Sequence, residues 1–141
     1  MSATGLKVFD STIQTTNIWL DDILKDLGWD DRHRAYHALR AVLHTLRDRL
    51  SVDEAAQLSA QLPLLIRGVF FEGWRPAHKP VKERRQDEFV AHVSESFALD
   101  TDADPQQITR SVLKVLGRHV DAGEMDSLRR VLPPAIQELL S

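Results

Sequence analysis

Apolar residues recur every three or four positions along most of the chain, the pattern of helices with one buried face. The first such stretch runs from about Ser11 to Leu27, with Gln14 placed to form a capping box and Gly28 placed to end the helix. A second stretch covers about 31–49 and a third covers 51–62. Pro63 interrupts the third stretch, so we expect residues 63–72 to form a separate or sharply bent segment.

The same pattern returns in the second half of the chain. Residues 73–83, GWRPAHKPVKE, hold two prolines and one glycine and predict a non-helical linker. Helical stripes follow over about 84–97, 105–120 and 121–132, and a short apolar turn covers 136–140. Asp104 and Pro105 have the residue types of a helix cap and a first helical position. Asp121 and Glu124 predict another capping box.

The two halves can be aligned without a gap by a shift of 70 residues. Ten of the 57 pairs between 14–70 and 84–140 are then identical, and they include capping, core and helix-breaking positions. We therefore predict an all-α single domain, 1–141, built as an internally duplicated bundle of two three-to-four-helix units. Unit one covers 11–72, the linker covers 73–83 and unit two covers 84–140. The identical pairs include Arg40/Arg110, Val42/Val112, Leu43/Leu113, Glu54/Glu124, Leu62/Leu132 and Pro63/Pro133.

Three segments also resemble a known family. They are AYHALRAVLHTLRDRL, QLPLLIRGVFFEGW and HKPVKERRQDEF, and the stretch from LP to EGW is the most specific. Together they resemble the bacterial DUF2267 family of unknown function over almost the whole chain. The resemblance implies an all-helical bacterial protein of about this size, and it assigns no catalytic or binding residue.

Composition narrows the function classes. With 43% apolar and 28% charged residues, the chain has the balance of an ordinary globular protein. The net charge of −3 gives no overall field that would attract nucleic acid or a membrane. No run of about 20 apolar residues is present to span a bilayer, and the N-terminus does not have the pattern of a secretory signal. We expect a soluble cytoplasmic protein without a membrane partner.

Three histidines and two arginines lie on one strip of the second predicted helix. His33, His37 and His44 fall within about 40° of one another, and Arg40 and Arg47 share their strip, about 150° from the leucine stripe. The simplest interpretation is a solvated basic face. A histidine pair four residues apart can bind a metal, but the carboxylate of the HExxH motif is absent and the arginines would repel a cation. No metal site is predicted.

The linker supplies a second group of basic residues, Arg75, Lys79 and Lys82, near the aromatic residues Phe70, Phe71 and Trp74. Cations that alternate with aromatic rings can hold phosphates and stack bases. The alternative interpretation is a solvent-exposed structural linker whose basic residues are hydrated, with the phenylalanines in the core.

No catalytic or cofactor motif occurs, so no enzyme activity, catalytic residue or cofactor is predicted. The leading hypothesis is a non-enzymatic interaction or scaffold protein that binds another protein or itself. The main alternative is anion or nucleic-acid binding, and a third is a ligand-binding or enzymatic pocket between the repeats. We expect no nucleic-acid partner. The candidate interaction surface consists of His33, His37, Arg40, His44, Arg47, Arg75, Lys79 and Lys82.

Overall fold

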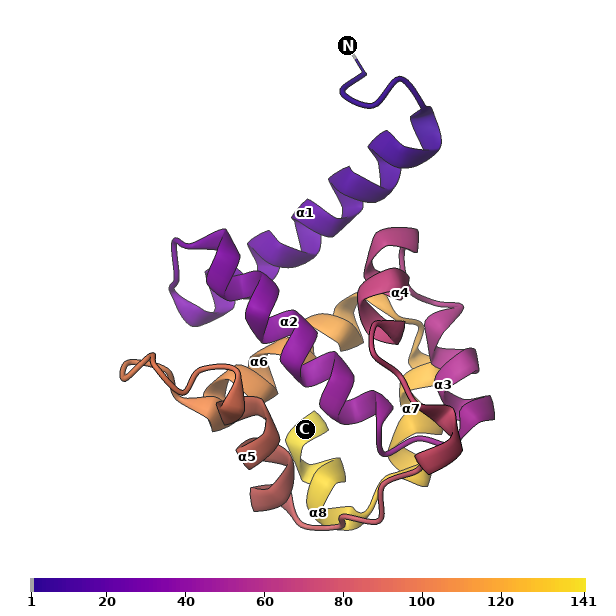
Figure 1. Ribbon diagram of the computed structural model, residues 1–141, viewed down its shortest axis with the longest axis vertical. Helices are drawn as coiled ribbons and strands as arrows, with labels where there is room; N and C mark the ends of the chain where they lie inside the picture. The colour runs from indigo at the N-terminus through magenta and orange to yellow at the C-terminus, as the bar shows by residue number, and fades with distance from the viewer. Residues whose placement is uncertain (1) are drawn as a thin grey trace.

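The computed structural model describes residues 2–141, and this part of the chain is helical, without a strand (Figure 1). None of its helices combines the length and the hydropathy needed to cross a membrane. The elements are α1 Lys7–Leu27, α2 Arg32–Arg47, α3 Val52–Ser59, α4 Leu64–Phe71, η1 Pro76–His78, α5 Gln86–Glu95, α6 Pro105–His119, α7 Ala122–Val131, α8 Pro134–Gln137 and η2 Glu138–Leu140. The prediction of an all-α fold is confirmed.

Helix α1 is longer than the sequence pattern predicted. It begins at Lys7, so Ser11 and Gln14 lie inside the helix and the predicted capping box between them is wrong. Leu6 stands at the N-cap and offers no capping side chain; instead, Asp10 accepts a hydrogen bond of 3.1 Å from the backbone N–H of Thr4. The end of the helix is as predicted, because Gly28 adopts the left-handed conformation, with φ of 69°.

The two central helices, α2 and α6, begin with the same cap chemistry. The Asp31 side chain accepts from the backbone N–H of His33, and the Asp104 side chain accepts from the N–H groups of Gln106 and Gln107. Each carboxylate thus satisfies donors that the first turn of a helix leaves free. The two caps also have nearly equal backbone dihedrals, with φ of −102° and −100°.

The short helices that follow α2 and α6 also match in their local chemistry. Ser51 and Glu54 form a complete capping box at the start of α3, as predicted. Asp121 makes half of such a box, because it accepts from the N–H of Glu124. Pro63 and Pro133 precede α4 and α8 with φ of −57° and −59°, so each proline starts a separate helix.

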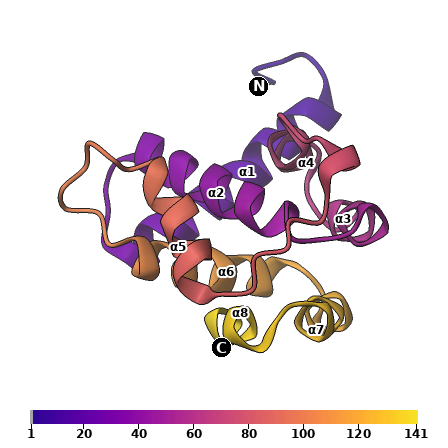
Figure 2. The same ribbon diagram turned by 60° about the horizontal axis from the view of Figure 1, so that its bottom comes forward.

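The core lies where these helices cross. α2 and α6 contact each other, α1 packs against both of them, and α5 also packs against both (Figure 2). Each outer helix therefore bridges the two halves of the chain. Six pairs of identical residues separated by 70 positions are no more than 3% exposed: Val42/Val112, Leu43/Leu113, Leu46/Leu116, Leu58/Leu128, Leu62/Leu132 and Ile66/Ile136.

The linker follows α4 and passes close to the end of α2. Its only helical part is the single 3-10 turn of η1, and α5 begins at Gln86, near the predicted position. The backbone N–H of Val81 donates to the carbonyl of Asp48 over 2.7 Å, which fastens the linker to the residue that ends α2. This contact brings linker side chains into one pocket with residues of α2 and α5.

Candidate functional site

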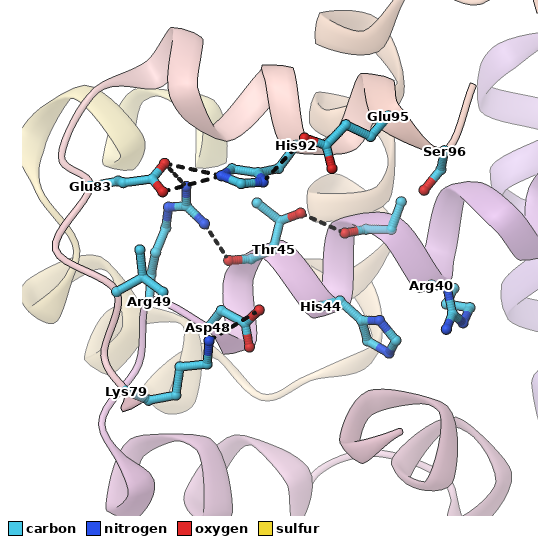
Figure 3. Close-up of a pocket in the computed structure, with 12 residues that line it drawn as sticks. Arg40, His44, Thr45, Asp48, Arg49, Lys79, Glu83, His92, Glu95 and Ser96 are labelled. Atoms are coloured by element: carbon cyan, nitrogen blue, oxygen red, sulfur yellow. Dashed lines mark hydrogen bonds and ion pairs between the residues drawn. The ribbon is translucent and has the colours of Figure 1, made fainter. Parts of the chain in front are cut away.

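A polar pocket of about 290 Å³ lies between α2, the linker and the start of the second half of the chain (Figure 3). Its side chains come from three segments, and α3 and α4 separate the first of them from the other two, so only the folded chain brings all three together. α2 and the residues after it supply Arg40, Ala41, His44, Thr45, Asp48 and Arg49; the linker supplies Lys79, Val81 and Glu83; α5 and its C-cap supply His92, Glu95 and Ser96.

One wall of the pocket is organised by Arg49. Its side chain is only 3% exposed, and its Nη2 lies 3.0 Å from the Glu83 carboxylate. Its Nη1 donates to the carbonyl of Thr45 over 2.9 Å. Burial lowers the pKa of Arg49 from its ordinary value, and the charge of Glu83 opposes this effect. Glu83 also accepts from His92 at 3.1 Å, so one carboxylate joins α2 to α5.

His44 lines the pocket as a half-buried imidazole. Its Nε2 lies 2.6 Å from the carbonyl oxygen of Val69, and a carbonyl can only accept, so the proton is on Nε2. Burial lowers the pKa of His44, and the charges of Arg47 and Arg40 act in the same direction. The neutral ring therefore keeps its other nitrogen, Nδ1, as an acceptor.

Asp48 holds two cations at the end of α2. Arg47 donates from Nε over 2.9 Å, and the ammonium of Lys79 lies 3.6 Å away. Arg47 also donates from Nη1 to the carbonyls of Phe70 and Glu72, both over 2.8 Å. Its guanidinium thus binds the otherwise unpaired carbonyls at the end of α4.

Arg40 closes the pocket near α4. Its Nε donates to the carboxylate of Glu72 over 2.7 Å, and this bond, together with the charge of Arg40, lowers the pKa of Glu72. All three cations of the lining, Arg40, Arg49 and Lys79, therefore have a carboxylate partner. The pocket offers polar groups of both signs and no unpaired cluster of positive charge for a phosphate.

The candidate residues from the sequence do not form one surface. Arg40, His44 and Lys79 meet in the pocket, whereas His33 and His37 lie near the start of α2 and Arg75 and Lys82 are exposed in the linker. The prediction that Arg47 lies on a solvated face is wrong, because Arg47 is only 4% exposed. The physical reason is that α4 covers this side of α2.

A second surface, on α1 and α4, was missed by the sequence interpretation. Leu6, Phe9 and Ile13 are spaced as one helical stripe and are 40–52% exposed. Leu64 and Leu65 at the start of α4 are exposed to a similar extent, 50% and 44%. The N–H of Leu65 donates to the Thr12 hydroxyl over 2.9 Å, which places the two helices side by side there. The spacing of residues 6, 9 and 13 could have revealed the stripe.

Histidine side chains come close together only as a pair in the described part of the chain. Within residues 2–141, no three or more histidine or acidic side chains gather closely enough to hold an ion together. The closest approach of two imidazoles is between His33 and His37 on α2, with 3.1 Å between their Nε2 atoms.

The described residues form an all-helical protein with a polar pocket between α2 and α5. A family model described as an uncharacterized conserved protein, DUF2267, matches residues 16–139, and the chain belongs to this family. The match covers nearly the whole chain and confirms the resemblance seen in the sequence. A comparison with curated proteins found no match.

Proposed function

We propose that this protein is a non-enzymatic interaction protein that pairs with a second copy of itself through the surface formed by α1 and α4. The observation that supports the proposal is the exposure of five large apolar side chains there, Leu6, Phe9, Ile13, Leu64 and Leu65. The first turns of α1 project away from the other helices (Figure 1), so this part of the helix is open to a partner. Exposed apolar side chains that gather in one place are typical of interaction sites.

The stripe on α1 continues the face that is buried further along the same helix. Residues 6, 9 and 13 lie within about 60° of one another and of Leu20, which is 9% exposed. The first half of α1 therefore has the pattern of a core helix but lacks a neighbour over most of its length. A second helix with the same pattern would supply the missing contacts.

The distribution of charged residues along α1 favours a second copy of the chain as the partner of this surface. Residues 11–20, STIQTTNIWL, contain no charged side chain, and depletion of charge is characteristic of interface cores. Lys7 and Asp10 give the start of α1 one charge of each sign. Two copies related by a two-fold axis would meet there without a net like-charge repulsion, and Lys7 of one copy could approach Asp10 of the other.

The size of the surface sets the expected strength of the pair. A standard interface uses about 20–30 residues on each side, and the exposed turns of α1 with the first turn of α4 provide fewer. We therefore expect a reversible dimer with a dissociation constant on the order of micromolar, about −8 kcal/mol.

Sedimentation velocity over a range of concentrations tests this proposal. Phe9→Gln and Ile13→Gln should each weaken the dimer at least tenfold. Ile18→Gln is the matched control, because Ile18 is 47% exposed on the same helix but lies about 180° around from Phe9. A wild-type protein that stays monomeric at several hundred micromolar, or an equal effect of the Ile18 variant, would refute the surface.

We infer further that the chain arose by duplication of a four-helix unit. The equal spacing of buried pairs and the matching dihedrals at Pro63 and Pro133 support this inference. The first turns of α1 fall outside the repeat, because the residues 70 positions later belong to the linker. A superposition of α2–α4 on α6–η2 in a crystal structure tests it: Leu43 should coincide with Leu113, and Pro63 with Pro133.

Binding of a small polar ligand in the pocket is a second candidate function. Polar side chains of α2, the linker and α5 converge on a volume of about 290 Å³, which is at the small end of ligand sites (Figure 3). Thermal-shift screening with small zwitterions tests it, with His92→Ala as the variant that alters the lining and His78→Ala as an exposed control outside it. Stabilisation that is lost in the His92 variant alone would support the pocket.

A further inference from the structure

Two exposed imidazoles on α2 approach each other through the same ring nitrogen. His33 and His37 stand one helical turn apart, and their Nε2 atoms are 3.1 Å from each other. The ring centres are 4.4 Å apart, and the planes meet at 77°. Both side chains reach solvent, and His33 is the more exposed of the two.

The contact has a simple proton count. A neutral imidazole carries one N–H, so two Nε2 atoms at hydrogen-bond distance share a single proton between them. When that proton leaves Nε2 and each ring carries its proton on Nδ1, two lone pairs lie side by side. This arrangement is the ligand pair that late first-row transition metals bind.

We propose that His33 and His37 chelate one divalent transition-metal ion through their Nε2 atoms. Nitrogen ligands lie about 2.0–2.1 Å from such an ion. Two nitrogens at that distance, at an angle between 90° and the tetrahedral value, are about 2.9–3.3 Å apart. The observed separation of 3.1 Å falls inside this range.

The arginines near His33 and His37 each have a carboxylate partner. Arg32 lies 3.0 Å from Asp21, Arg34 lies 2.8 Å from Asp100 and Arg40 lies 2.7 Å from Glu72. The sequence interpretation rejected a metal because Arg40 and Arg47 would repel it. In the folded protein both have carboxylate partners, and Arg47 is buried against the end of α4. The electrostatic objection is therefore much reduced.

The site has two protein ligands, since no third metal-ligating side chain joins them within the part of the chain that the structure describes. Water or buffer would occupy the remaining positions. Imidazole ligands favour Cu²⁺ over Ni²⁺ and Zn²⁺, in the order of the first-row series, and they do not favour Mg²⁺ or Ca²⁺. We therefore expect the pair to bind divalent transition-metal ions of borderline softness, and Cu²⁺ most tightly.

The full chain, without a histidine tag, is titrated with Cu²⁺, Ni²⁺ and Zn²⁺. The pH of the titration is about one unit above the ordinary imidazole pKa, so that imidazole is mostly neutral. Proton NMR of the six histidines is the direct readout, because paramagnetic Cu²⁺ broadens the signals of its ligands first. The rings of His33 and His37 should broaden together, before those of the other four. Calorimetry should give one Cu²⁺ per chain.

His33→Ala and His37→Ala should each lower the Cu²⁺ affinity at least tenfold, and the double variant should be no worse than either, because one imidazole alone does not chelate. His78→Ala is the matched control, since His78 is also exposed but lies in the linker. Circular dichroism verifies that α2 is intact. Broadening that starts at another histidine, or equal losses for the His78 and His37 variants, would overturn the proposal.

Discussion

Arg49 and His119 make the same kind of contact in the two halves of the molecule. The guanidinium carbon of Arg49 lies 5.0 Å from the ring centre of Phe89, and His119 stacks on Trp19 with 4.8 Å between ring centres. Arg49 and His119 are 70 positions apart, and so are the two rings that they contact, Trp19 and Phe89. Because the aromatic ring in each contact belongs to the opposite half of the chain, the two contacts join the halves.

The two contacts should differ in their contribution to stability. Arg49→Met removes hydrogen bonds to Thr45 and Glu83 at a side chain that is only 3% exposed. We expect the free energy of unfolding to fall by about 2 kcal/mol or more, because buried acceptors lose their donor. Urea denaturation monitored by circular dichroism measures the change.

His119→Phe is the matched variant in the other half. It keeps the stacking on Trp19 and loses the contact with Asp22, whose side chain is 27% exposed and can be hydrated. The expected loss is below about 1 kcal/mol, because the Asp22 carboxylate that loses its hydrogen bond can be hydrated instead. If the His119 variant loses more free energy of unfolding than the Arg49 variant, the exposed fraction of the side chains does not determine the loss.

Leu43 and Leu113 should contribute similarly to the core. They are 0% and 2% exposed, so truncation of either residue to alanine should cost about 2–5 kcal/mol. Leu99→Ala is the control, because Leu99 is fully exposed and should change stability by less than about 0.5 kcal/mol. Denaturant titrations that give a loss under about 0.5 kcal/mol for both core variants would contradict this packing.

The features that local chemistry determines were predictable from the sequence. Ser51 and Asp104 cap their helices as expected, and Pro63 starts a separate helix. Leu43 and Leu113 are buried because their stripe faces the crossing helix in any all-helical packing of this pattern. Each of these results depends on residues within a few positions of one another, or on helical periodicity alone.

The features that depend on long-range contacts were not predictable. A helical wheel assigned Arg47 to solvent because it assumes one buried face, whereas α2 contacts α1, α4, α5 and α6. Arg47 lies against carbonyls of Phe70 and Glu72, more than 20 positions away, which no local pattern indicates. The start of α1 was missed for the opposite reason: Leu6 supplies no side-chain cap, so the usual start signal is absent.

His44 should make the protein less stable in mild acid. Burial lowers its pKa in the folded state, so below the ordinary value of about 6.5 the unfolded chain binds more protons than the folded one. The free energy of unfolding therefore falls as the pH drops through that value, and it is unaffected by this group well above it. His44→Gln can keep a donor for the carbonyl of Val69 and cannot titrate. The difference in stability between variant and wild type should shift in favour of the variant from about pH 7.5 to 5.5, in urea melts at each pH.

The basic linker residues should not bind nucleic acid at physiological salt. Lys79 is paired with Asp48 and its side chain is only 14% exposed, so Arg75 and Lys82 remain as exposed cations on a chain of net charge −3. Arg75→Glu with Lys82→Glu should leave stability within about 0.5 kcal/mol of the wild type. Lys79→Glu should cost more, because it sets a second carboxylate beside Asp48.

Fluorescence anisotropy with single- and double-stranded DNA measures this directly. The wild type and the double reversal should both show no binding at physiological salt, because screening limits each exposed cation to roughly 8 Å. A submicromolar affinity that falls steeply with added salt and is abolished by the double reversal would contradict the prediction. It would favour anion or nucleic-acid binding over pairing through α1 and α4, provided that Phe9→Gln leaves the DNA affinity unchanged.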